Sequence, residues 1–272
     1  MILGSHLAAL LCYLAAWVTH LEFFRRGRSS PDGRAVGATS AGFVFHLAGL
    51  VAFALHERAL PLVGVGPASS TLALAVVAFT LGAAVRPDTR ASGLFLLPLA
   101  VALLAEAILV GLHPAPRQLA FRGPWLVLHV TTVFAGFAGL ALASAASAMY
   151  VLQFRTLKRK EFGSVFRFFP SLDALDRLGG LGLGIGFPAL SVGLLAGWGW
   201  TLTYGPTLPP DDPQVVLAVV AWGSYLAAIG ARLSPRWRGP RAALVSAAAF
   251  VATALAFVVL RLLADGTGDS FL

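Results

Sequence analysis

Residues 92–113 read SGLFLLPLAVALLAEAILVGLH, and this stretch decides the fold class of the chain. Glu106 is its only Asp, Glu, Lys or Arg residue. An apolar run of about 20 residues crosses the hydrocarbon core of a bilayer as a helix, which satisfies its own backbone hydrogen bonds in lipid. Similar runs recur and predict an all-α fold, a polytopic membrane helix bundle with eight transmembrane helices. The expected spans are residues 3–24, 35–57, 69–86, 92–113, 124–154, 178–204, 214–232 and 240–263.

The composition agrees with a membrane protein and excludes several other classes. The chain is 58% hydrophobic and 12% charged, whereas soluble domains carry about 25% charged residues. Its net charge of +8 does not indicate nucleic-acid binding, because the basic residues lie between apolar runs rather than in one soluble patch. Cys12, the single cysteine, cannot form an internal disulfide. The absence of a CxxCH motif excludes a c-type cytochrome with its own covalent haem.

The loops alternate in charge along the chain. Most of the 20 lysines and arginines lie in the first, third, fifth and seventh loops. The positive-inside rule makes these loops cytoplasmic and both termini external, an N-out/C-out topology. The first apolar run is followed by arginines and preceded by none, the reverse of a cleaved signal peptide, so we expect it to be retained. We predict one integral membrane domain over residues 1–272, with four N-terminal spans in 1–123 and a four-span core in 124–272, in a bacterial-type inner (cytoplasmic) membrane.

All six histidines lie within the first 129 residues. Imidazole is costly in hydrocarbon, so histidines in a membrane predict a functional site, and imidazole is also a common axial ligand of haem iron. The predicted topology puts four of them near the outer face, one near mid-depth and one near the inner face: His6, His56, His113 and His129; His46; and His20. Each interfacial histidine also has a simpler interpretation, as a polar side chain among the lipid headgroups.

Other polar and aromatic residues are predicted near the same face. Glu106 lies seven residues before His113, on one face of the fourth predicted helix, where it could hydrogen-bond an imidazole or pair with a neighbouring helix. Trp198 and Trp200 are expected either in an interfacial aromatic belt or as a platform for a porphyrin. Arg261 could pair with a haem propionate, or extend its charge to the headgroups.

The fifth loop and the sixth span have patterns of their own. Residues 161–177 contain several phenylalanines among charges. Residues 162–169 are expected in the cytoplasmic interface, where a basic loop can fix topology or dock a partner. Ser171 is expected to cap the N-terminus of the sixth helix. That helix is rich in glycine, which favours close helix packing in lipid. CxxC, HExxH, GxSxG and Walker motifs are absent.

The second half of the chain carries short motifs in a recognisable order. They are Trp125-Leu-Val-Leu-His129-Val, Tyr150-Val-Leu-Gln153-Phe-Arg155, Pro170-Ser-Leu-Asp-Ala-Leu-Asp-Arg177, Gly186-Phe-Pro-Ala-Leu-Ser-Val-Gly193, Trp198-Gly-Trp200, Asp212-Pro213, Ala221-Trp222 and Trp237-Arg238-Gly239-Pro-Arg241. Over about residues 124–263, this order resembles the cytochrome c assembly protein family. It is most similar to the HemX/YpjD-like branch related to CcsA.

The resemblance implies haem handling at the outer face, beside a tryptophan-rich loop and flanking histidine ligands. His129 matches the histidine before that loop, and Trp198, Trp200 and Asp212-Pro213 match a remnant of its WWD signature. The chain departs from the pattern at Gln214, where the family has lysine. It also lacks the two later histidines, expected near Gly230 and near residues 264–265. The resemblance therefore implies haem handling without a complete cytochrome c synthase site.

We therefore expect a haem-associated membrane protein of cytochrome c assembly or tetrapyrrole homeostasis, and not an autonomous synthase. Haem is the expected cofactor. His129 is the preferred iron ligand, and His46 the first choice for the second, with His56 and His113 as other candidates. Expected partners are the lipid bilayer and other cytochrome c maturation or membrane subunits. The alternatives are a cofactor-free scaffold or regulatory subunit that docks a partner through the cytoplasmic basic loop, and a small-molecule transporter.

Overall fold

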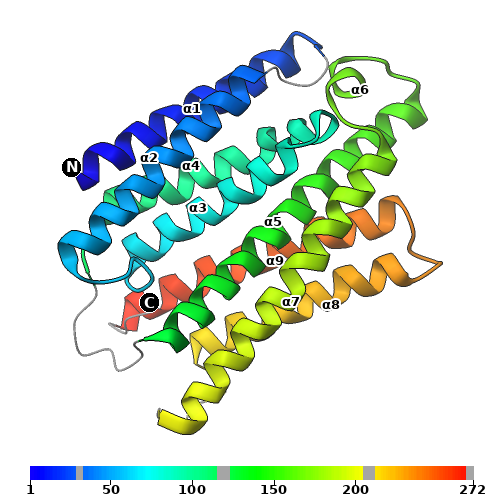
Figure 1. The fold of residues 1–272 in the computed structure, drawn as a ribbon. Coiled ribbons are helices and arrows are strands. Elements are labelled where there is room, and N and C mark those ends of the chain that lie inside the picture. The colour runs from blue at the N-terminus through cyan, green and yellow to red at the C-terminus, as the bar shows by residue number, and fades with distance from the viewer. Residues whose placement is uncertain (29–32, 115–122, 205–211, 268–272) are drawn as a thin grey trace.

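The protein is helical throughout the part of the chain that the computed structural model describes, residues 1–28, 33–114, 123–204 and 212–267 (Figure 1). For residues 203–204 and 261–267 only the backbone is described. The helices are α1 (Ile2–Arg25), α2 (Gly33–Glu57), α3 (Val65–Ala84), α4 (Gly93–Val110), α5 (Pro124–Arg159), α6 (Ser164–Phe168), α7 (Leu172–Tyr204), α8 (Pro213–Leu233) and α9 (Pro240–Thr267), with a 3-10 turn, η1 (Pro87–Ser92), before α4.

Eight of these helices are long and apolar enough to cross a membrane, which confirms the predicted number of spans. They alternate in direction, so their ends gather in two groups. We call the end where α1 and α5 begin the termini end, and the end where they finish the basic end. Figure 1 shows the N- and C-terminal ends of the described chain on the same side of the bundle. The predicted N-out/C-out orientation remains a prediction.

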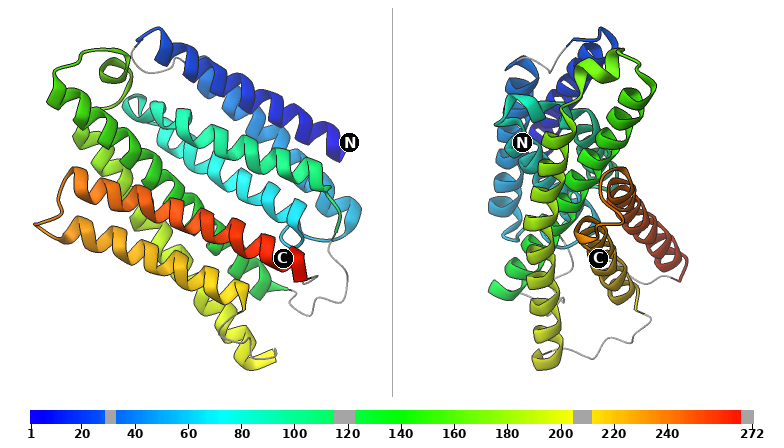
Figure 2. Two further views of the ribbon diagram at one scale, coloured as in Figure 1. Left: turned by 180° about the vertical axis from the view of Figure 1, so that it is seen from behind. Right: turned by 90° about the vertical axis from the view of Figure 1, so that its right-hand side faces the viewer.

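The helices form two adjoining groups. Helices α1 to α4 pack on one another, and α3 also packs on α5. Helix α5 then pairs along its length with α7, and α9 lies against both α5 and α8 (Figure 2). One buried apolar cluster joins the two groups, with Tyr13, Val77 and Leu104 from the first group and Leu142 and Leu178 from the second.

Glycines bring α5 and α7 into backbone contact. A Cβ on Gly139 of α5 would lie 2.7 Å from the carbonyl oxygen of Gly182 of α7. A Cβ on Gly182 would lie equally close to the carbonyl oxygen of Gly139. A Cβ on Gly136 would likewise lie 2.7 Å from the Cβ of Leu190 of α7. The prediction that glycines of the sixth span allow close packing is therefore confirmed, because a side chain at either central position would force the helices apart.

Several helix boundaries differ from the sequence-based prediction. Helix α7 begins at Leu172, before the apolar span predicted from residue 178. The backbone N–H of Ala174 donates to the Ser171 Oγ at 3.3 Å, which confirms that Ser171 caps the start of this helix. Helix α4 ends at Val110 because Gly111 adopts a φ of +99°. The prediction that His113 shares a helical face with Glu106 is therefore wrong, since His113 lies beyond the helix.

The fifth loop also differs from its prediction in part. Phe168 and Phe169 are buried, at 2% and 6% exposure. They pack in an aromatic cluster with Phe24 of α1. Phe162 and Phe166 stay exposed and contact each other. The segment is therefore a folded element that attaches α6 to the bundle, and only its first two aromatic rings are available at the surface.

Candidate functional site

His129 lies in the second turn of α5, at the termini end, and is held by α7. Its Nδ1 is 2.7 Å from the carbonyl oxygen of Gly193. A carbonyl oxygen can only accept, so Nδ1 carries the proton and, in the neutral ring, Nε2 carries the lone pair. Histidines that bind metals usually donate their other N–H to a carbonyl or carboxylate in this way, which fixes the ring and its tautomer.

A glycine on α7 makes room for this ring. A Cβ on Gly197 would lie 2.8 Å from the Cε1 and Nδ1 atoms of His129. Gly193 and Gly197 are one turn apart, so a single stripe of α7 supplies both the acceptor and the space for the imidazole. The ring is half-buried and is held against α7 through its Nδ1.

Two of the predicted aromatic residues follow directly on the same helix. Trp198 is 66% exposed, and Trp200 is half-buried. Trp125, at the start of α5, is 45% exposed. The last turns of α7 extend past the neighbouring helices at the termini end (Figure 1). His129 therefore has exposed indoles on both of the helices that position it.

His46 occupies a different environment, inside the N-terminal group of helices. Its Nδ1 lies 3.2 Å from the Tyr13 hydroxyl, and its Nε2 lies 2.8 Å from the Ser70 Oγ. The same Ser70 oxygen lies 3.1 Å from the Nε2 of His6, whose Nδ1 is 2.8 Å from the carbonyl oxygen of Ile2. All four side chains are fully buried. We call Tyr13, His46, Ser70 and His6 the buried polar chain.

For neutral rings the donors in this chain are fixed by elimination. His6 must donate from Nδ1 to the Ile2 carbonyl, so its Nε2 accepts the proton of the Ser70 hydroxyl. That hydroxyl has no second proton, so its oxygen accepts from the Nε2–H of His46. The Nδ1 of His46 then accepts from the Tyr13 hydroxyl. Every group is satisfied, and the two histidines hold opposite tautomers.

The remaining predicted ligands are spread over the termini end. His56 has an exposed side chain, 3.8 Å from the carboxylate of Glu57. His113 is exposed and packs over Gly111. The side chain of Arg261 lies outside the described residues. The contacts of His46 are with α1 and α3 and those of His129 with α7, so the structure does not bring these two predicted ligands together.

Sequence reasoning missed Ser70, Gly193 and Gly197 as partners of the histidine rings. Ser69 and Ser70 are a polar pair at the start of the third span, and this was the available signal. Ser69 donates to the Oε2 of Glu106 at 3.1 Å, which confirms the interpretation that Glu106 pairs with a neighbouring helix. His20, at the basic end, has both nitrogens on carbonyl oxygens, of Ala16 and Arg90.

Comparison with known proteins gives a consistent set of relatives. A family model described as "Cytochrome C assembly protein" matches residues 37–267. The cytochrome c biogenesis protein CcsA of Guillardia theta is 27% identical over 167 residues, 56% of this chain and 56% of the relative. CcsA of Chlamydomonas reinhardtii is 26% identical over 152 residues, 56% and 42% of the two chains, and CcsA of Synechococcus sp. (strain CC9605) is 29% identical over 173 residues, 56% and 57%.

The chain matches about half the length of these curated relatives. No solved structure matches it. His6 and Tyr13 of the buried polar chain lie before residue 37, outside the family match.

Proposed function

Because this chain belongs to the cytochrome c assembly protein family, we propose that it binds haem, or passes it on, at the termini end, with Nε2 of His129 as an iron ligand. The observation that carries the proposal is the hydrogen bond from His129 to the Gly193 carbonyl. This hydrogen bond leaves the lone pair on Nε2, as iron binding through that atom requires. The carbonyl of Gly193 and the space over Gly197 hold the ring in one orientation. Haem would supply the iron and the porphyrin plane, while the protein supplies the oriented imidazole and the indole surface.

The surroundings of His129 suit a large flat apolar ligand. Trp198, with its 66% exposed indole, or Trp200 offers an indole on which a porphyrin can stack. The two cannot form one surface, because residues two apart on a helix point to different sides. In this proposal Arg261 pairs with a propionate, which is one of its two sequence-based interpretations. For the second axial ligand we favour His56 or His113, which are exposed at the same end. His46 would have to break its hydrogen bonds to Tyr13 and Ser70 first.

The finer points of the sequence-based interpretation belong to the same proposal. We place both termini outside a bacterial inner membrane, so that His129 faces the exterior, where c-type cytochromes are assembled. Gln214 and the missing histidines near Gly230 and residues 264–265 favour a protein of the HemX/YpjD-like branch. It would hold haem without attaching it covalently, beside other maturation subunits.

The test is a haem titration of the purified protein in detergent. We expect a stoichiometric Soret band for the wild type. His129→Gly should weaken the Soret band, and added imidazole should restore the band by occupying the space of the missing ring. Arg58→Ala, which removes an exposed charge near the same end, is the matched control and should leave the band unchanged. A wild-type protein that binds no haem at stoichiometric levels would overturn the proposal.

One observation supports the alternative of a docking subunit. Phe162 is 59% exposed and contacts Phe166 with ring centroids 5.0 Å apart. The pair follows the basic residues Lys158, Arg159 and Lys160 at the end of α5. A colourless protein that co-purifies with a partner, and loses it on Phe162→Ser, would favour this second function.

A further inference from the structure

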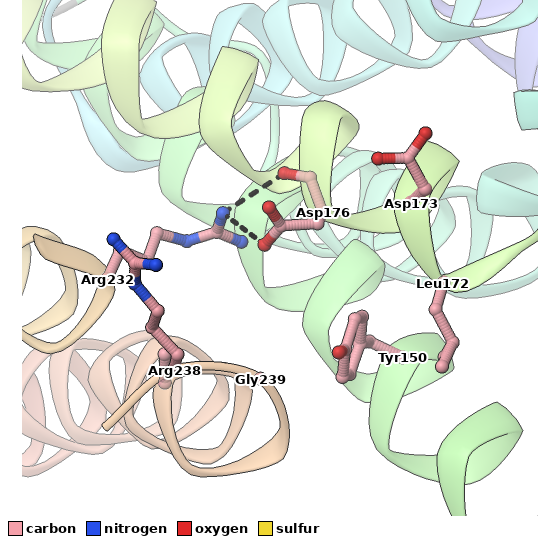
Figure 3. Close-up of a pocket in the computed structure, with 8 residues that line it drawn as sticks. Tyr150, Leu172, Asp173, Asp176, Arg232, Arg238 and Gly239 are labelled. Atoms are coloured by element: carbon pink, nitrogen blue, oxygen red, sulfur yellow. Dashed lines mark hydrogen bonds and ion pairs between the residues drawn. The ribbon is translucent and has the colours of Figure 1, made fainter. Parts of the chain in front are cut away.

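A cavity lies at the basic end of the bundle, at the opposite end from His129. Its volume is about 550 Å³, within the range of about 300 to 1,000 Å³ typical of small-molecule sites. It lies where α7 and α9 begin and α8 ends, with one wall from α5 (Figure 3). Its lining is Tyr150, Leu172, Asp173, Asp176, Arg232, Arg238, Gly239 and Ala242.

Most of the charges in this cavity already have partners. The Nη1 of Arg232 donates to the side chain of Asp176 at 2.9 Å and to its backbone carbonyl at 3.0 Å (Figure 3). Asp173 pairs with Arg177, one turn along α7. Arg238 is the remaining charged side chain of the lining, and among the described residues it forms no ion pair. The uncompensated charge of the cavity is therefore positive.

Two helix N-termini add to this positive potential. Leu172 and Asp173 begin α7, and Gly239 directly precedes Pro240, the first residue of α9. The N-terminus of a helix carries about half a positive charge, which favours a nearby anion. The N–H groups of Ala174 and Ala242 already donate to the Ser171 Oγ and to the Trp237 carbonyl, so these helix ends contribute through their dipoles. The hydroxyl of Tyr150 lies close to Gly239, since a Cβ on that glycine would be 3.4 Å from it. No hydrogen bond joins this hydroxyl to a described residue, so it can donate to a ligand.

We propose that this cavity binds the phosphoryl group of a membrane phospholipid. Arg238 would supply the cation and Tyr150 a hydroxyl donor. Asp173 and Asp176, each paired with an arginine, form another part of the lining. The position fits a lipid, because the cavity lies at helix ends, next to a turn with an apolar surface. Leu233, the last residue of α8, is 75% exposed, and Trp237 in the turn is 49% exposed. Tryptophan at a helix end marks the level of the headgroups.

The experiment measures lipid binding by native mass spectrometry of the delipidated full-length protein. The probes are phosphatidylglycerol, diacylglycerol, which lacks the phosphate, and glycerol phosphate, which lacks the acyl chains. We expect phosphatidylglycerol to bind far more tightly than diacylglycerol. Arg238→Gln should weaken its binding about tenfold, and Tyr150→Phe about threefold.

Arg236→Gln is the matched control, since Arg236 is exposed in the same turn but does not line the cavity. It should bind phosphatidylglycerol like the wild type, and unchanged thermal unfolding of each variant excludes misfolding. Equal effects of the Arg238 and Arg236 variants, or equal binding of diacylglycerol, would overturn the proposal. Binding of glycerol phosphate alone, lost with Arg238→Gln, would support a phosphoryl site and assign it to a soluble ester. Substitution of His129 should not alter lipid binding, so this result is independent of the haem proposal.

Discussion

Most of the aromatic and imidazole rings that matter in this protein lie against a glycine. A Cβ on Gly49 would be 2.7 Å from the His6 ring, and a Cβ on Gly42 would be 2.6 Å from the Tyr13 ring. The same relation holds for His129 and Gly197. The two glycines of α2 are seven residues apart, as are the rings on α1. A ring that packs on a glycine can approach that helix closely, because the glycine has no side chain. The ring's nitrogen or hydroxyl can then reach a hydrogen-bond partner on a third helix.

The buried polar chain predicts a large cost for losing its central hydroxyl. Ser70→Ala would remove the shared partner of both Nε2 atoms and leave two buried nitrogens unpaired. We expect a loss of stability of about 1 to 3 kcal/mol for each unsatisfied group, seen as a lower unfolding midpoint in detergent. Nitrogen-15 NMR of labelled histidine should also show opposite tautomers for His6 and His46 in the wild type.

Ser92→Ala is the control for this prediction. Ser92 is fully buried, but its hydroxyl has no hydrogen-bond partner among the described residues. Removing it should cost nothing or slightly stabilise the protein. If both alanine variants unfold at the wild-type midpoint, the buried polar chain contributes no stability.

At the scale of elements, the pairing of α5 with α7 organises the second half of the molecule. The sequence predicts that α7 packs closely, because glycine is frequent in it. It does not predict which glycine meets which, since the register of two helices depends on contacts between residues far apart in the chain. The seam also extends to the termini end, where Gly193 and Gly197 hold the ring of His129.

The seam can be tested with two glycines that differ only in their surroundings. Gly139→Ala would place a methyl group 2.7 Å from the Gly182 carbonyl oxygen, and we expect a loss of stability of about 1 to 3 kcal/mol from overpacking. Gly184→Ala adds the same methyl group where nothing lies within 4 Å. It should be neutral or stabilising, because alanine is the better helix former. Equal unfolding midpoints for the two variants would contradict this account of the seam.

At the scale of the whole molecule, the eight spans follow from apolar length alone, and this part of the fold could be predicted. The gathering of His6, His56, His113 and His129 at one end could also be predicted, because alternating spans require it. The separation of His46 from His129 could not, since hydropathy places a residue in depth but does not say which helices are neighbours. The end of α4 before His113 was missed because it depends on the left-handed conformation of Gly111.

The predicted topology can be tested by labelling single cysteines in intact cells. In a Cys12→Ala background, Ala59→Cys places a thiol at the termini end and Ser234→Cys places one at the basic end. We expect a membrane-impermeant maleimide to label only the first, and to label the second after permeabilisation. The reverse pattern would put the basic loops and His129 on opposite sides from those proposed. Equal labelling of both cysteines in intact cells would contradict the odd number of spans, α3, α4, α5, α7 and α8, that separates them.

Helix α5 spans 36 residues, about 54 Å at 1.5 Å per residue, and the close packing of its glycines against α7 fixes the register of the two helices. The two helices therefore form one packed pair. Helix α5 is longer than the roughly 30 Å hydrocarbon layer of a bilayer. A tilt of this pair at one membrane face would therefore also displace its opposite end, in the other aqueous compartment.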